Sequence, residues 1–307
     1  MHKIRIGTRG SKLALWQAGW VKQQLRENGV EVCIVEIKTS GDVSQTEPIR
    51  GLGGTGVFTK EIQSALLENE IDVAVHSLKD LPTEVVLGLE LAAVPQRGPF
   101  RDVLLCSVFQ SIDDLPHGAT IGTGSARRKA QLLNLYADQF KIVEIRGNVE
   151  TRLKKLSVGD YDAIVLAEAG LVRLGLQKHI TSYLEQPLFL PAVGQGALGL
   201  EIRSGDQSTF EAIAPLNDPK TFAAITAERT MLQALRGGCL APIAAYTETA
   251  QGELSLHGRV LSPDGKEMVE SKQIGLLSEP KKLGISVAEE LLRNNAAEII
   301  AYYNHNQ

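Results

Sequence analysis

A cysteine in a glycine-rich turn is the most reactive group that the sequence offers. Cys239 lies in the run Arg-Gly-Gly-Cys-Leu-Ala-Pro, directly after a predicted helix. Most cysteines are buried and behave as small hydrophobic residues, and we interpret Cys33 and Cys106 in that way. Cys239 differs from them, because an irregular loop exposes its thiol to solvent. The neighbouring Arg236 favours the thiolate form, which attacks electrophiles.

An acidic side chain lies where a predicted strand ends. Asp80 follows Lys79 and precedes Pro82 by two residues. A carboxylate in this place can exchange protons or stabilise a cation that forms beside it. The structural alternative is that Asp80 caps the backbone of its own turn, which is the commoner role for aspartate. His76 and Ser77 have no evident triad partner, so we expect no nucleophilic acyl chemistry.

Arginines recur where predicted strands end and predicted helices begin. Ligands of open α/β sheets bind at the carboxyl ends of the strands, and helix N-termini add backbone donors for anions. Arginine holds a carboxylate or phosphate through two parallel hydrogen bonds. A single arginine at such a position is a solvated surface residue about as often as it is a ligand-binding residue. Six arginines at comparable positions predict a site for a polyanion. The six are Arg9, Arg127, Arg128, Arg146, Arg152 and Arg173.

Two glycine-rich segments accompany these residues. The turn at residues 122–125 has the sequence Gly-Thr-Gly-Ser and can bind an anion through its backbone amides. It lacks the GxxxxGK[ST] spacing of nucleotide hydrolases, so nucleotide hydrolysis is not predicted. The longer segment at residues 39–56 is predicted to be a loop, either a lid over the site or a plain connection.

Strands and helices alternate along the first two thirds of the chain. The strands are predicted at residues 4–7, 32–37, 72–75, 120–122, 141–144 and 162–166. The helices are predicted at residues 12–27, 59–68, 125–136, 149–156 and 168–174. This alternation is typical of βαβ units in parallel sheets. Breaker-rich segments at 95–99 and 190–196 predict two crossings between two lobes.

The sequence changes character near residue 217. A helix is predicted at 221–235, followed by strands at 243–246, 254–261 and 268–273, and closing helices within 286–303. We therefore predict an α/β fold of two doubly wound βα lobes that resemble periplasmic binding proteins, with a hinged cleft. A small α+β C-terminal domain follows them. The predicted domains are 1–96 with 195–216, then 100–190, and 217–307.

Composition narrows the class of function. The 307 residues carry a formal net charge of −4 and only 5% aromatic residues, which argues against nucleic-acid or anionic-membrane partners. The three cysteines show no metal-binding spacing, so we expect no metal and no disulfide framework. No signal-like start and no long apolar run is evident. We expect a cytoplasmic protein.

Several motifs together resemble the porphobilinogen deaminase family, in that family's order and over nearly the whole chain. They are GTRGSKLALWQ (7–17), AVHSLKDLP (74–82), GTGSARR (122–128), RGNVETRL (146–153), AGLVRLG (169–175), LPAVGQGA (190–197), the Glu-Arg pair at 228–229 and GGC (237–239). The resemblance implies a transferase of tetrapyrrole and heme biosynthesis, a hydroxymethylbilane synthase. It also implies a monomer whose partner is porphobilinogen, with no nucleic acid or membrane.

The resemblance implies a mechanism as well. Porphobilinogen loses ammonia to give an azafulvene cation, and four such units are joined head to tail on a dipyrromethane cofactor. Hydroxymethylbilane is then released by hydrolysis. The cofactor is itself made from substrate and is bound to Cys239 by a thioether.

The family's functional residues match positions already identified. Asp80 matches the catalytic aspartate, which is expected to hold pyrrole N–H groups and offset positive charge. The implied cofactor-binding residues are Cys239, Ser11, Lys79, Asp80, Ser125, Arg127, Arg128, Arg146 and Arg152. The implied substrate-binding residues are Arg9, Ser11, Arg146, Arg152 and Arg173. Each pyrrole unit carries two carboxylates, which accounts for local arginine density in a chain of negative net charge.

Two other functions remain open from the sequence. A solute-binding protein would also have two βα lobes joined by two crossings, but it would not need an exposed Cys239. A degenerate enzyme would keep the fold and cofactor without turnover. Thr55 supports that alternative, because it stands where the family commonly has lysine.

Overall fold

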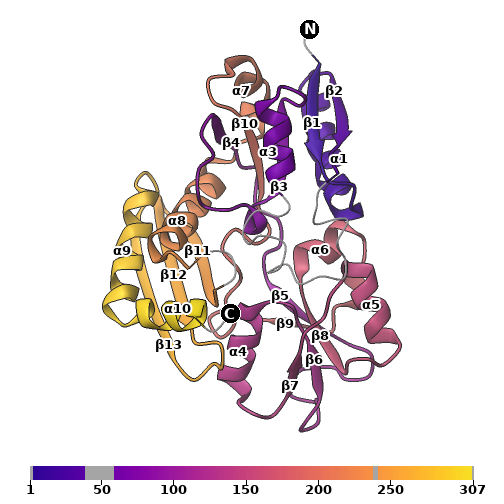
Figure 1. Cartoon of the computed structure of the whole chain (residues 1–307), viewed down its shortest axis with the longest axis vertical. Coiled ribbons are helices and arrows are strands. Elements are labelled where there is room, and N and C mark those ends of the chain that lie inside the picture. Colours follow the sequence, from indigo (N-terminus) through magenta and orange to yellow (C-terminus); the bar gives the residue numbers. More distant parts are fainter. Residues whose placement is uncertain (1–2, 39–58, 238–240, 306–307) are drawn as a thin grey trace. The chain divides into compact units, whose positions relative to one another are not determined.

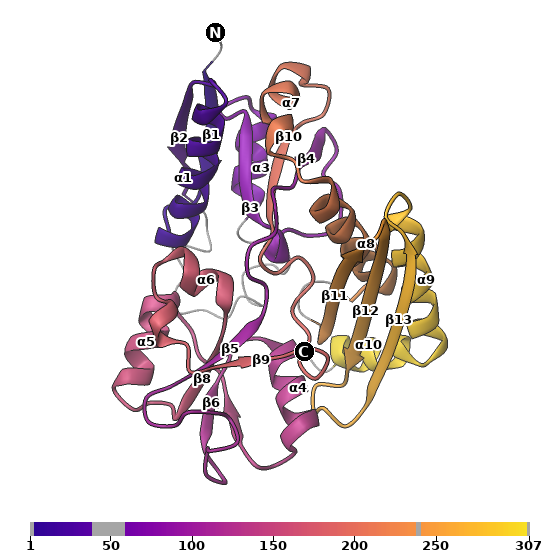
Figure 2. The same cartoon turned by 180° about the vertical axis from the view of Figure 1, so that it is seen from behind.

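The computed structural model describes residues 3–38, 59–237 and 241–305 (Figures 1 and 2). The chain forms two compact units, each discontinuous in sequence. The first comprises Met1–Gly98 with Gly196–Phe222, and the second comprises Pro99–Gln195 with Ala223–Gln307. The chain thus passes between the units inside each of the two segments predicted as crossings. The division into three domains stays a prediction.

A five-stranded mixed sheet forms the centre of the first unit. Its strands are β1 (Ile4–Thr8), β2 (Val32–Glu36), β3 (Val73–Ser77), β4 (Leu89–Ala93) and β10 (Leu198–Arg203), in the order β2-β1-β3-β10-β4. β2, β1 and β3 are parallel, as predicted. The prediction of a parallel sheet is wrong for β10, which runs antiparallel to β3 and β4. The chain leaves the first unit after β4 and returns to it at Gly196, so the direction of β10 depends on the end at which the chain enters the sheet again.

Helices cover both faces of this sheet, as the doubly wound prediction requires. They are α1 (Lys12–Glu27), α3 (Lys60–Leu67) and α7 (Gln207–Ile213). Successive residues of a strand point to opposite faces. Val73 and Val75 accordingly share one apolar cluster with Val21 of α1, whereas Ala74 shares another with Leu66 of α3.

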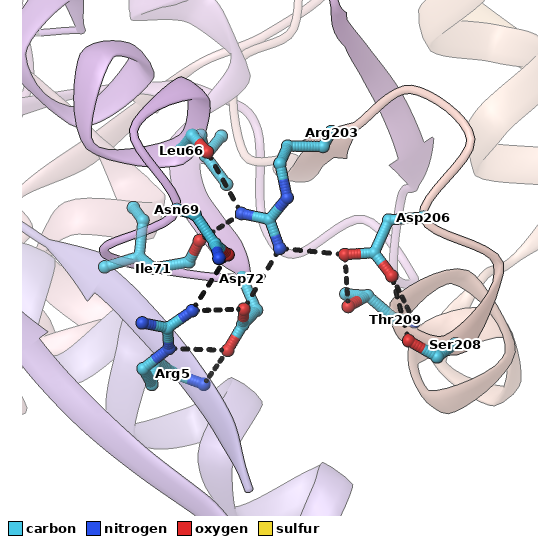
Figure 3. A network of polar contacts seen from close by, with 9 residues as sticks. All are labelled: Arg5, Leu66, Asn69, Ile71, Asp72, Arg203, Asp206, Ser208 and Thr209. Atoms are coloured by element: carbon cyan, nitrogen blue, oxygen red, sulfur yellow. Dashed lines mark hydrogen bonds and ion pairs between the residues drawn. The ribbon is translucent and has the colours of Figure 1, made fainter. Parts of the chain in front are cut away.

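An ion-pair network joins three strands of this sheet near the start of β3 (Figure 3). The buried Asp72 accepts hydrogen bonds from Arg5 Nε at 3.0 Å and Arg5 Nη2 at 2.8 Å. Arg203 of β10 donates to the same carboxylate at 3.0 Å and to Asp206 at 2.8 Å. Burial alone would raise the pKa of Asp72, but hydrogen bonds from the two arginines outweigh it and lower that pKa to about 2.

The second unit contains a five-stranded mixed sheet of similar design. Its strands are β5 (Asp102–Cys106), β6 (Thr120–Gly122), β7 (Lys141–Val143), β8 (Ala163–Ala167) and β9 (Ser182–Leu184), in the order β7-β6-β8-β5-β9. β5 is antiparallel to β8 and β9, which again departs from the parallel prediction. Its helices are α4 (Ala126–Tyr136), α5 (Val149–Ser157) and α6 (Glu168–Arg173). Val165 of β8 shares a cluster with Leu132 of α4, and Ile164 shares another with Leu156 of α5.

The second unit also contains a three-stranded antiparallel sheet, which confirms the predicted α+β segment. The strands are β11 (Ile243–Ala250), β12 (Glu253–Leu261) and β13 (Met268–Leu276). The helices are α8 (Pro219–Leu235), whose first four residues belong to the first unit, α9 (Pro280–Arg293) and α10 (Ala296–His305). α9 begins six residues before the predicted start, at a proline that suits the first helical turn. Met231, Leu256 and Val287 are fully buried in the core between helices and sheet.

No helix within the described ranges combines the length and the apolar character needed to cross a bilayer.

Candidate active site

A small pocket in the first unit lies where β1 and β3 end. It has a volume of about 80 Å³ and is bordered by α1 and α3. Its lining includes Thr8, Arg9, Ser11, Gln17, Thr59, His76, Ser77 and Asp80. The fold therefore brings together three residues that the sequence predicted separately: Arg9, Ser11 and Asp80. Lys79 lies in the same short turn as Asp80, η2 (Leu78–Asp80), but is not among the lining residues.

Two buried leucines fix the turn that carries Asp80. Leu78 is 1% exposed and its backbone N–H donates to Ala197 O at 3.1 Å, and Leu81 is 5% exposed. Because the leucines point inward, the carboxylate of Asp80 between them is exposed. This carboxylate is accessible to solvent, so a ligand can donate hydrogen bonds to it without any rearrangement of the turn.

Ser11 and Ser125 both begin helices. Ser11 Oγ accepts from Ala14 N at 3.3 Å at the start of α1, and Ser125 Oγ accepts from Arg128 N at 3.4 Å at the start of α4. A hydroxyl that accepts in a helix cap still has its own O–H to donate. The capping role is thus compatible with the predicted contact to a ligand.

Sequence reasoning missed the buried polar residues behind this pocket. Gln17 is 3% exposed and donates to Ser77 Oγ at 2.8 Å. His76 Nε2 lies 2.9 Å from Glu201 Oε2, and Gln63 Nε2 donates to the same carboxylate at 3.0 Å. Gln17 and His76 both lie in motifs that carry the family resemblance, but the sequence did not indicate their partners. Glu201 lies 125 residues from His76, so no local pattern could pair them.

The arginine pair of α4 is buried in the second unit around one carboxylate. Asp102 is 1% exposed and lies 2.7 Å from Arg127 Nη1 and 2.7 Å from Arg128 Nη2. Gln195 Nε2 also donates to Asp102 at 3.0 Å. Burial would raise the pKa of Asp102, but the two adjacent positive charges lower it to about 2. Two guanidinium groups share one carboxylate, so this cluster keeps one excess positive charge.

Arg127 retains an unused donor. Its Nη1 atom contacts Asp102 and, at 2.5 Å, Leu190 O. Its Nε atom is buried and has no hydrogen-bond partner within the described part of the chain. Burial lowers the pKa of Arg127, since a charge removed from water is destabilised. An additional anion at Nε would relieve both the missing hydrogen bond and the excess charge.

The remaining predicted arginines of the second unit add positive charge. Arg152 of α5 donates to Gly147 O at 2.8 Å, and Arg146 forms an ion pair with Glu144. Burial and the positive charges of Arg128 and Arg146 together lower the pKa of Arg152 to about 10. Arg152 is therefore close enough to Arg128 and to Arg146 to be repelled by both charges, an arrangement that favours a bound anion. Burial also lowers the pKa of Arg173, at the end of α6, to about 10.

Two models of one protein family match the chain. "Porphobilinogen deaminase, dipyromethane cofactor binding domain" matches residues 4–211, and "Porphobilinogen deaminase, C-terminal domain" matches residues 222–293. The chain belongs to the porphobilinogen deaminase family. This confirms the family and the enzyme class that the sequence motifs predicted.

Curated relatives agree with this result. The porphobilinogen deaminase of Geobacter sulfurreducens is 47% identical over 303 residues, which cover 98% of this chain and 95% of the relative. That of Syntrophobacter fumaroxidans is 45% identical over 299 residues, covering 97% and 96% respectively. Among solved structures, that of the methionine-binding protein MetQ is similar to this chain at 12% sequence identity and a TM-score of 0.45. The matched region covers 70% of this chain and 89% of the MetQ chain.

The first family model also describes the porphobilinogen deaminase cofactor, dipyrromethane. The residues of the second unit fit such a group, because a dipyrromethane carries several carboxylates. The excess charge at Arg127 and Arg128 and the buried Nε of Arg127 suit a carboxylate ligand. Cys239 and Thr55, which the sequence analysis also identified, lie outside the described residues.

Proposed function

We propose that this chain deaminates porphobilinogen and joins four molecules of it head to tail on a covalent dipyrromethane cofactor, releasing hydroxymethylbilane. The observation that supports this most is the shared carboxylate of the α4 arginine pair. Among the described residues, Arg127 and Arg128 share one ion-pair partner, Asp102, and Arg127 Nε has no hydrogen-bond partner. Such a site suits a substrate class in which every unit brings carboxylates.

The proposed catalytic group is Asp80. Its exposed carboxylate at the pocket rim would accept hydrogen bonds from pyrrole N–H groups. It would also offset the positive charge that develops on the substrate when ammonia leaves, since a fixed carboxylate stabilises a nearby cation. The same carboxylate could accept the proton that leaves the carbon at which the rings join.

Cofactor and substrate would share three side chains: Ser11, Arg146 and Arg152. When bound, the dipyrromethane supplies the pyrrole to which the first substrate unit is joined. We propose that a thioether to Cys239 holds it, and that Ser11, Lys79, Asp80, Ser125, Arg127, Arg128, Arg146 and Arg152 bind it. For the substrate carboxylates we propose Arg9, Ser11, Arg146, Arg152 and Arg173. Three domains, a monomeric state and a cytoplasmic location stay predictions.

A turnover assay tests this function. The purified full-length chain, incubated with porphobilinogen, should release one ammonia for each porphobilinogen consumed and one hydroxymethylbilane for every four. Binding of porphobilinogen without consumption would favour a solute-binding protein. A loaded cofactor without turnover would favour the degenerate enzyme, and in that case Thr55→Lys is the first variant to assay.

A further inference from the structure

A buried arginine of the three-stranded sheet reaches toward α4. Arg259 lies on β12 and is 6% exposed. Its Nη2 donates to Pro187 O at 2.8 Å, and its Nη1 donates to Leu188 O at 2.7 Å and to Gln131 Oε1 at 2.9 Å. Its Nε donates to Glu270. Neither the family motifs nor the proposed mechanism gives this side chain a role.

The next group in this chain of contacts is the amide of Gln131 on α4. Gln131 is fully buried, and its Oε1 accepts from both Arg259 and Leu190 N, the latter at 2.8 Å. Its Nε2 donates to Leu190 O at 3.0 Å. A guanidinium and a backbone N–H can only donate, so Arg259 and Leu190 N together fix which end of the amide carries the oxygen. Gln131 and the backbone of Leu190 thus form a reciprocal pair of hydrogen bonds.

The carbonyl of Leu190 links Gln131 to the arginine pair of α4. It accepts from Gln131 and, at 2.5 Å, from Arg127 Nη1, which also contacts Asp102. The inward edge of the Arg127 guanidinium is therefore held by two fixed acceptors, Leu190 O and Asp102. The buried Nε remains as the donor for an additional anion.

We propose that Arg259 is a positioning residue for Arg127, acting through Gln131 and the Leu190 carbonyl. The three-stranded sheet thereby sets the orientation of the guanidinium that binds a carboxylate. The inference rests on the proposed function in one respect: the carboxylate is taken to be that of the dipyrromethane cofactor. Buried side chains that are hydrogen-bonded to one another restrict one another's orientation, and here the restriction pre-forms the carboxylate site around Arg127 Nε.

The three-stranded sheet does not depend on Arg259 alone for its attachment to α4. Asn134 of α4 donates to Gly265 O at 2.8 Å, and Ala126 packs against the apolar core of that sheet. The variant Arg259→Met keeps much of the apolar length of the side chain and should therefore fold. It removes the donors to Gln131, Leu188, Pro187 and Glu270.

The test is a double-mutant cycle on cofactor loading, with Arg259→Met, Arg127→Met and both together. Full-length chain purified without cofactor is mixed with porphobilinogen, and its intact mass is followed over time. We expect Arg259→Met to slow loading about 5-fold, because contacting groups of one network are coupled. In the Arg127→Met background the same change should slow loading less than about 2-fold. Equal effects in both backgrounds, or no effect in the wild type, would overturn the proposal.

A matched control separates positioning from loss of stability. Val287→Ala creates a cavity in the same core, where Val287 is fully buried, without touching the network. It should lower the melting temperature but leave the loading rate unchanged at a temperature well below the transition. If Val287→Ala slows loading as much as Arg259→Met does, the effect is one of stability and the proposal is wrong.

A second measurement does not require the cofactor. In protein labelled with ¹⁵N-arginine, the Nε–H signal of Arg127 is assigned by its loss in Arg127→Met. We expect this signal to shift or broaden in Arg259→Met and to stay in place in Val287→Ala. An unchanged signal in Arg259→Met overturns the proposal whether or not the wild type loads. A shifted signal with no loading of the wild type leaves the positioning intact and refutes the proposed function instead.

Discussion

At the scale of single residues, the same side-chain type does two different tasks in this protein. Arg5 and Arg203 are matched by Asp72 and Asp206, so their charges are balanced and they join strands. The arginine pair of α4 shares the single carboxylate of Asp102, which leaves excess positive charge for an anion. The ratio of acidic to basic side chains around an arginine distinguishes a structural contact from a candidate site.

Removing the charge of Asp80 tests the proposed catalytic group. Asp80→Asn keeps the shape of an exposed side chain and should leave the fold unchanged. Because a carboxylate is needed to offset charge and to move protons, we expect kcat to fall roughly 10²- to 10⁴-fold. Steady-state kinetics with porphobilinogen measure this, with the melting temperature and the intact mass as controls. Turnover near that of the wild type would rule out the role.

Cys106 should be unreactive. Burial, with a smaller contribution from the negative charge of Asp162, raises its pKa to about 11. Because the thiolate is the reacting form, alkylation at pH 8 should be roughly 100-fold slower than for an ordinary thiol. The rate should increase with pH until about pH 11. Iodoacetamide labelling followed by peptide mass analysis measures this, and the chain unfolded in urea is the control. Fast labelling of Cys106 in the folded chain would contradict this environment.

The candidate site was predictable to the extent that its residue types are unusual for their local sequence. Six arginines at strand ends and Asp80 in a turn were visible in this way. Their partners were not: Asp102 lies 25 residues from Arg127, and Gln195 lies 93 residues from Asp102. Burial and pairing arise from the tertiary fold, so no local pattern could supply them.

At the scale of elements, the helices and the parallel strands were predictable because their apolar periodicity is strong. The strands β4, β5, β9 and β10 and the helix α7 were not assigned from the sequence. A short apolar run such as Val-Leu-Leu in β5 has no periodicity of its own to identify it. The antiparallel direction of β5 and β10 depends on which end of the sheet the chain enters, which composition does not encode.

The Asp72 network should make the first unit sensitive to acid. The folded pKa of Asp72 is about 2, below its ordinary value of 3.8, so its stabilising contribution is complete above the ordinary value. It is lost as the pH falls from about 4 to 2. The shift corresponds to roughly 2 kcal/mol of unfolding free energy at pH 7.

Urea unfolding of the wild type and of Asp72→Asn measures this contribution. The difference in unfolding free energy should be about 1 kcal/mol smaller at pH 3 than at pH 7, because at pH 3 the Asp72 carboxylate is largely protonated in the unfolded chain but still ionised in the folded one. Glu253→Gln, at an exposed position on β12, serves as a control that should show no such pH dependence. A difference that stays constant from pH 7 to pH 3 would contradict the role of the network.

At the scale of the whole molecule, the proposed site residues are divided between the two units. Arg9, Ser11, Lys79 and Asp80 belong to the first unit. Ser125, Arg127, Arg128, Arg146, Arg152 and Arg173 belong to the second. The proposed catalytic carboxylate and the arginine pair proposed to bind the cofactor are thus carried by different units.

The intact mass of the freshly purified chain tests the central claim most directly. We predict an increment equal to two linked pyrrole units in the wild type and the bare chain mass in Cys239→Ser, because the thioether needs that sulfur. If the wild type lacks the increment, it is incubated with porphobilinogen and weighed again. A wild type that still has the bare mass, or a Cys239→Ser variant that carries the same increment, would contradict the account.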